Sequence, residues 1–84
     1  MTNLANPRFT TVRWREGYAF GDVDDFLADV RPLLDGPLPN NALADRIETV
    51  RFSPVRLRPG YDMDEVDQHL DQLFTLASQG RPVA

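Results

Sequence analysis

An internal repeat constrains this chain more than any other feature of its sequence. The segment from Phe9 to Val30 recurs 43 residues later as Phe52 to Leu73, and nine of the 22 aligned positions are identical. The identical pairs are Phe9/Phe52, Val12/Val55, Arg13/Arg56, Arg15/Arg58, Gly17/Gly60, Tyr18/Tyr61, Val23/Val66, Asp24/Asp67 and Leu27/Leu70. A repeated segment is one structural unit used twice, so the two copies are expected to fold alike and to bury a shared core.

The length of 84 residues suits one small domain. We expect a single domain over 1–84, with repeat one at 8–36, a linker and short helix at 37–50, and repeat two at 51–79. A chain this short buries only about 60–65% of the surface that its unfolded form exposes, so its stability margin is small.

Each repeat begins with an extended segment and a glycine. Residues 9–14 are rich in β-branched and aromatic side chains, which favour an extended backbone, and 52–57 match them. Pro54 lacks a backbone donor, so any strand there belongs at a sheet edge. Gly17 and Gly60 are expected to occupy turns with positive φ.

A helix is predicted after each glycine. In repeat two, Asp62 is the expected N-cap with Glu65 three residues on, a variant of the capping box, and Gly80 and Pro82 end the helix. Its apolar stripe comprises Val66, Leu70, Leu73, Phe74 and Ala77. Repeat one has the stripe Val23, Phe26, Leu27, Val30 and Leu34. There Ala19 replaces the capping residue, and Pro32 is expected to kink or tighten the helix before it stops at Gly36.

A short helix is predicted from Ala42 to Thr49, capped by an asparagine of the linker. Neither long helix can bury its stripe alone, so the two stripes are expected to face each other, with Val66, Leu70 and Leu73 against Val23, Leu27 and Val30. The predicted fold class is therefore mainly α. It consists of two pseudo-symmetric loop-plus-helix repeats with paired helices, a short connecting helix, and short β-strands in the arginine-rich loops.

Charge is segregated along each repeat. All nine basic residues are arginines, and six of them precede the two Gly-Tyr pairs, whereas ten of the thirteen acids lie within 22–35 or 62–71. The net charge of −4 argues against nonspecific nucleic-acid binding. The basic loops still leave an anionic surface open as a local target.

The chain lacks the residue types that several kinds of functional site require. The chain has no cysteine, which excludes disulfides and thiolate metal sites and fits a cytoplasmic location. With His69 as its only histidine, a metal site or a histidine-activated nucleophile is not expected. We expect neither an enzyme nor a cofactor. No apolar run approaches the length of a membrane span, and residues 1–9 do not resemble a signal peptide.

The pattern Phe-x-x-Val-Arg-x-Arg-x-Gly-Tyr, followed by Asp-x-Asp-Glu-Val-Asp, resembles the N-terminal domain of the DivIVA family. Residues 60–67 are the closer copy, and repeat one keeps Gly17, Tyr18, Val23 and Asp24. The resemblance is greatest to small actinobacterial-type proteins with tandem DivIVA motifs. It implies a cytoplasmic, non-enzymatic protein of cell division or polar growth, built on a parallel helix pair whose loops cross at a membrane-touching tip. Since this chain carries two motifs and no coiled coil follows Ala77, the pair is expected within one molecule.

The candidate binding residues lie in the two loops. Partner or membrane binding is assigned to Arg13, Trp14, Arg15, Arg56, Leu57 and Arg58, and a structural role to Gly17, Tyr18, Asp24, Gly60, Tyr61 and Asp67. Alternatives remain for several of them. The arginines are equally suited to pairing with the acidic helix starts, and a lone tryptophan is typical of a core. The tyrosines are expected to pack with hydrogen-bonded hydroxyls, and the aspartates to pair with arginine or backbone donors.

The resulting hypothesis is a non-catalytic, DivIVA-like protein-interaction domain that serves as an adaptor in bacterial cell division or polar growth. Its expected partner is a protein with acidic side chains, such as a DivIVA-like scaffold or another division protein, and no nucleic acid. The alternative is a peripheral binder of the inner membrane that uses the arginine-rich loop tips. The chain is expected to be a monomer or a small dimer, the latter by exchange of repeats.

Overall fold

The computed structural model describes residues 7–80, and Pro82, expected beyond the last helix, lies outside this range. Within it the elements are β1 (Thr11–Val12), β2 (Gly17–Tyr18), α1 (Phe20–Asp35), α2 (Asn41–Thr49), β3 (Pro54–Val55), β4 (Gly60–Tyr61) and α3 (Met63–Gln79). The described chain is thus a mixed α/β structure, with three helices and a small four-stranded antiparallel sheet, rather than a mainly α one. Short strands are present, but they flank the arginine-rich loops rather than include the arginines.

The sheet joins the two halves of the chain by exchanging their strands. Its order is β1-β4-β2-β3, so each edge strand pairs with the central strand of the other half. Thr11 lies opposite Tyr61, Tyr18 lies opposite Pro54, and the two tyrosines face each other across the centre. Pro54 is in an edge strand, where its missing N–H breaks no ladder, as the sequence predicted.

Gly17 and Gly60 correct the turn prediction. Both lie in central strands, and among the described residues only Gly80 is a glycine with positive φ. Their requirement for glycine comes from close approach instead. A Cβ on Gly17 would lie 2.8 Å from the carbonyl oxygen of Tyr61, and one on Gly60 would lie 2.8 Å from that of Tyr18. The two central strands can cross at this distance only because neither glycine has a side chain.

Capping residues set the helix ends largely as predicted. The carboxylate of Asp62 accepts the backbone N–H of Glu65 at 3.0 Å at the start of α3, and Gly80 ends that helix with φ 81°. Ala19 provides no side-chain cap for α1, which continues through Pro32 to Asp35. Its last turn tightens, because the N–H of Gly36 donates to the carbonyl of Leu33 at 3.3 Å. Asn40 caps α2 by accepting the N–H of Leu43 at 3.1 Å.

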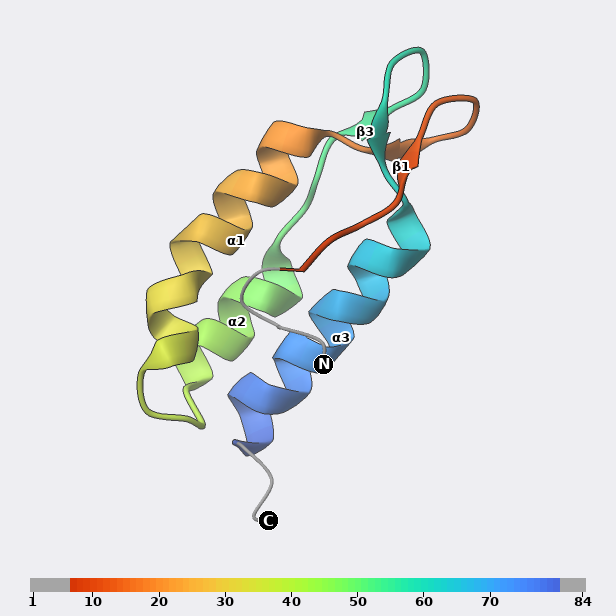
Figure 1. Ribbon diagram of the computed structural model, residues 1–84. Helices are drawn as coiled ribbons and strands as arrows, with labels where there is room; N and C mark the ends of the chain where they lie inside the picture. The colour runs from red at the N-terminus through yellow and green to blue at the C-terminus, as the bar shows by residue number, and fades with distance from the viewer. Residues whose placement is uncertain (1–6, 81–84) are drawn as a thin grey trace.

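The helices pack differently from the expected pair. Helices α1 and α3 leave the sheet in the same general direction, and α2 runs back toward the sheet (Figure 1). The backbone of α3 lies closest to α2, not to α1. All three helices still contribute to one core, whose largest fully buried side chains are Val23, Val30, Leu43, Val66 and Leu73.

The buried face of α3 differs from the predicted stripe at His69, which the stripe did not include, and at Leu70. His69 is buried, at 6% exposure, against the ring of Phe9, with 5.6 Å between ring centres. Leu70 is only partly buried and faces the region beside α2 rather than the centre of the core. Because α2 packs on one flank of α3, His69 and Leu73 are buried, whereas Leu70 lies at the edge of the core and also lines the groove beside α2.

Candidate functional site

Two loops project side by side from the sheet, at the end away from the turn between α1 and α2 (Figure 1). These tip loops are residues 13–16, between β1 and β2, and residues 56–59, between β3 and β4. Buried Val12 and Val55 precede them, and buried Gly17 and Gly60 follow them. Since each loop leaves an edge strand and enters a central strand, both of its ends are held by the other half of the chain.

Each tip loop exposes a large apolar side chain at its second position. Trp14 is 96% exposed and Leu57, its counterpart 43 residues on, is 98% exposed. The expectation that the lone tryptophan lies in the core is therefore wrong. The loop projects from the sheet immediately after buried Val12, which carries Trp14 away from the core (Figure 1). Exposed apolar side chains of this size, close together at one end of a domain, are typical of binding surfaces.

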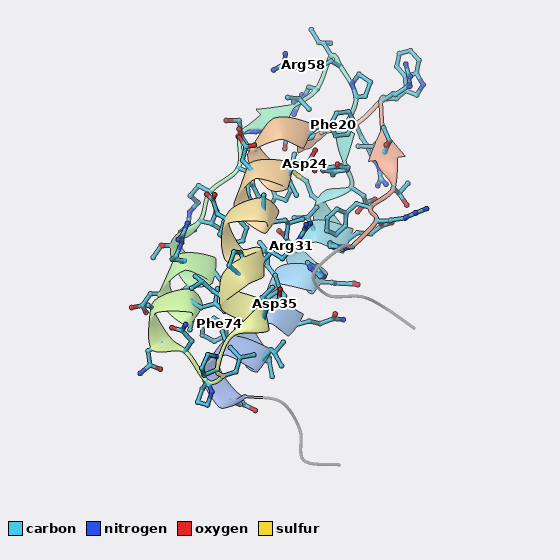
Figure 2. All side chains as sticks on the ribbon, turned by 60° about the vertical axis from the view of Figure 1, so that its left-hand side comes forward. Phe20, Asp24, Arg31, Asp35, Arg58 and Phe74 are labelled. Atoms are coloured by element: carbon cyan, nitrogen blue, oxygen red, sulfur yellow. The ribbon has the colours of Figure 1, made fainter. Side chains whose placement is uncertain are left out.

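The tip arginines divide into paired and unpaired groups. Arg15 forms an ion pair with Asp62 at the start of α3, and Arg56 lies 3.7 Å from Glu16 of the neighbouring tip loop. Neither Arg13 nor Arg58 has an ion pair within residues 7–80. Arg58 lies at the far end of the domain (Figure 2). The tips therefore combine two exposed apolar side chains with two unneutralised positive charges.

Two side-chain hydrogen bonds lie at the base of the tip loops. The residues of one are the counterparts, 43 positions apart, of the residues of the other. The hydroxyl of Tyr18 donates to Asp67 at 2.8 Å, and that of Tyr61 donates to Asp24 at 2.7 Å. In each case burial, followed by the hydrogen bond to the carboxylate and its charge, raises the pKa of the tyrosine to about 12. The tyrosine hydroxyls are thus bonded as expected, whereas the aspartates take tyrosine donors rather than arginine or backbone donors.

Backbone hydrogen bonds repeat the same arrangement. Ala19 N–H donates to the carbonyl of Ser53 at 2.9 Å, and Asp62 N–H donates to that of Thr10 at 2.8 Å. The carboxylates at the helix starts take the adjoining amides: Asp22 accepts Ser53 N–H at 2.8 Å, and Glu65 accepts Thr10 N–H at 2.7 Å. The hydrogen bonds from Ser53 lower the pKa of Asp22. In a full capping box the side chain of Glu65 would bond back to the N–H of Asp62. Here it accepts a hydrogen bond from the other half of the chain instead.

Two further kinds of feature, a metal-binding cluster and a membrane-spanning helix, are absent from the described residues. Residues 7–80 contain no group of three or more His, Cys, Asp or Glu side chains placed to hold a metal ion. In the same range, no helix has both the length and the apolarity needed to cross a membrane. Phe74, predicted in the buried stripe of α3, is instead 37% exposed beside α2. A usable signal was Arg31, the counterpart of Phe74, which indicates that this position faces outward.

Comparisons with protein-family models, with curated proteins and with solved structures found no match for the chain.

Proposed function

We propose that this chain is a non-catalytic interaction domain of the DivIVA type, formed by two pseudo-symmetric repeats in one molecule and docking through its tip loops. The observation that carries the proposal is the placement of Trp14 and Leu57, which are 96% and 98% exposed on adjacent loops. A side chain this exposed contributes almost nothing to the core. Its apolar surface becomes useful only when a binding partner covers it.

Arginine chemistry favours a protein partner with acidic side chains. The guanidinium group binds carboxylates through two parallel hydrogen bonds, and Arg13 and Arg58 have no such acceptor within the described chain. Aromatic residues and arginines are also enriched among the residues that dominate binding energy at interfaces. The proposed role is an adaptor in bacterial cell division or polar growth, located in the cytoplasm or at the inner face of the membrane.

A second candidate function is docking to an anionic membrane surface. It is favoured by the combination of two apolar side chains with two unpaired arginines at the same end of the domain. Burying the leucine side chain would contribute about 1.5–3 kcal/mol, and each arginine near an anionic surface about 1 kcal/mol. These contributions together suit reversible attachment, which salt would weaken.

The test uses two double variants of the tips, Trp14→Ser with Leu57→Ser and Arg13→Ala with Arg58→Ala. Both are expected to keep the free energy of unfolding within about 0.5 kcal/mol of the parent, because the altered groups are exposed. Arg31→Ala, on the exposed face of α1, is the matched control for loss of an arginine.

Each variant is used as bait in affinity purification from the native host and in sedimentation with vesicles of phosphatidylglycerol and phosphatidylcholine. A protein that the parent and Arg31→Ala retain, and that both tip variants lose, supports the adaptor function. Salt-sensitive vesicle binding lost in the same variants supports the membrane function. Retention of every ligand by both tip variants would refute docking through the tips.

A further inference from the structure

A groove of about 700 Å³ lies between α2 and α3, on the flank of the domain. Its apolar surface comes from Ile47 and Val50 on one side, and from Leu70 and Phe74 on the other. Leu70 and Phe74 are four residues apart on α3, so they lie on the same face of that helix. Phe74 lies beside α2 and far from Arg58 at the tips (Figure 2). The groove is therefore an apolar surface separate from the tip loops.

The rim of the groove is acidic. Glu48, Asp67 and Asp71 line it together with a single arginine, Arg51. That arginine is folded onto its own backbone, since its guanidinium donates to the carbonyls of Val50 at 2.7 Å and Glu48 at 3.3 Å. Neither Glu48 nor Asp71 has an ion pair in the part of the chain that the structure describes. The groove thus combines an apolar floor with carboxylates that lack a cation.

Two residues that give the groove its character, Asp71 and Phe74, are not repeated in the other half of the chain. The counterparts of Asp71 and Phe74, 43 residues earlier, are Ala28 and Arg31. Both of these earlier positions are exposed, and neither holds an acid or an aromatic side chain. Phe74 and Asp71 thus add apolar surface and a carboxylate that the other repeat lacks at the same positions. An aromatic side chain that is 37% exposed beside acids is suited to contact with a partner.

We infer that the groove receives tip loop 13–16 of a second copy of this chain. That loop presents Trp14 directly after Arg13, an apolar anchor beside an unpaired positive charge, whereas Arg15 on its other side is already paired with Asp62. The groove presents the complement, apolar side chains between carboxylates. At 96% exposure, Trp14 does not fill the groove of its own chain. The unpaired Arg13 of one copy and the unpaired acids of the other neutralise each other on contact.

Such a contact joins two different surfaces, a tip on one copy and a groove on the next. It is heterologous, so it continues from copy to copy unless the chain of contacts closes into a ring. A single loop in a groove buries a small area, which suits weak and transient association. A tip loop bound in the groove of another copy is covered. Self-association would therefore compete with binding of Trp14 to any other partner. The inference uses the exposure of the tips but does not depend on what else they bind.

Sedimentation equilibrium of the full chain over a wide range of concentration tests the contact. The parent is expected to show an average mass that rises with concentration and falls when salt is added. Phe74→Arg, which copies the arginine at position 31, and Trp14→Ser are each expected to weaken association by about tenfold or more. Asp71→Arg is expected to do the same, whereas Asp25→Arg, with the same change of charge on exposed α1, is not.

Mixing the two defective proteins makes the test specific. Phe74→Arg keeps an intact tip and Trp14→Ser keeps an intact groove, so their mixture is expected to form a one-to-one complex that grows no further. A parent that stays monomeric at its highest soluble concentration would overturn the inference, as would association that Phe74→Arg leaves unchanged, or a mixture that forms no complex. Vesicle or partner binding by Phe74→Arg is expected to equal or exceed that of the parent, which separates failure of this inference from failure of the tips as a docking surface.

Discussion

Replacing Gly17 by alanine tests the crossing of the two central strands most directly. The added Cβ would lie 2.8 Å from both the carbonyl oxygen of Tyr61 and Cγ2 of Val12, and 3.1 Å from the carbonyl carbon of Gly60. The valine side chain has little rotational freedom at χ1, and a backbone oxygen cannot move without the strand. The strands themselves must therefore shift to relieve the clash. Overpacking of this kind costs about 1–3 kcal/mol, and we expect the upper half of that range. A domain of 84 residues has a total stability of roughly 4–13 kcal/mol, so the variant remains folded but weakened.

Urea unfolding followed by circular dichroism measures the loss, and Gly21→Ala provides the matched control. A Cβ on Gly21 would meet nothing within 4 Å. Because alanine favours a helix more than glycine does, this control is expected to stabilise the domain by up to about 1 kcal/mol. The same chemical change is thus expected to have opposite signs at the two positions. Equal effects of Gly17→Ala and Gly21→Ala on the free energy of unfolding would refute the reasoning.

The double variant Gly17→Ala with Gly60→Ala extends the test to coupling. A Cβ on Gly60 would lie 3.2 Å from the carbonyl carbon of Gly17, so each substitution pushes the same two strands apart. Movement that relieves one clash relieves part of the other. The double variant is therefore expected to cost less than the sum of the single variants, whereas independent sites would add.

Three further predictions concern other contacts. The pKa of Tyr61 is raised from 10.0 to about 12. Its contribution to the free energy of unfolding is therefore expected to be complete below pH 10 and to be lost as the pH rises toward 12. Ultraviolet titration of tyrosinate checks this, and Asp24→Asn should lower the pKa of Tyr61. Ala19→Asp, which gives α1 the cap that α3 has, is expected to raise the free energy of unfolding by about 1 kcal/mol in urea titrations. Leu73→Ala, at a fully buried site, is expected to cost about 2–5 kcal/mol, and Leu70→Ala less than half as much; equal costs would contradict the arrangement of α3.

Local features of the fold were largely predictable from the sequence. Asp62 and Asn40 cap their helices, Gly80 ends α3, and Pro54 occupies an edge strand, because each of these depends on a residue and its immediate neighbours. The exchange of strands was not predictable in the same way. Nothing in the local sequence states that the strand at Val12 pairs with the strand at Gly60 and not with the one at Gly17.

The errors share one physical origin. Glycine in a sequence signals either a positive φ or the close approach of another chain segment, and only the tertiary structure decides between them. Leu70 and Phe74 fit a helical stripe, but the position of α2 against α3 determines which part of that stripe is covered. For Trp14 the sequence left a binding role and a core position open, because a lone tryptophan is typical of a core; the structure places it on an outward-facing loop.

The strand exchange also explains why the tips can serve as a binding surface without weakening the fold. Each tip loop connects an edge strand to a central strand, and both strands are bonded to the other half of the chain. The contacts that hold the loops in place are the glycine crossing and the tyrosine–aspartate pairs at their base, together with the ion pairs of Arg15 and Arg56. Residues at the apex, such as Trp14 and Arg58, make none of these contacts within the described chain. Substitution of these residues is therefore expected to leave the fold intact. The structure thus separates the residues that hold the fold together from the exposed apex residues that we propose as the docking surface.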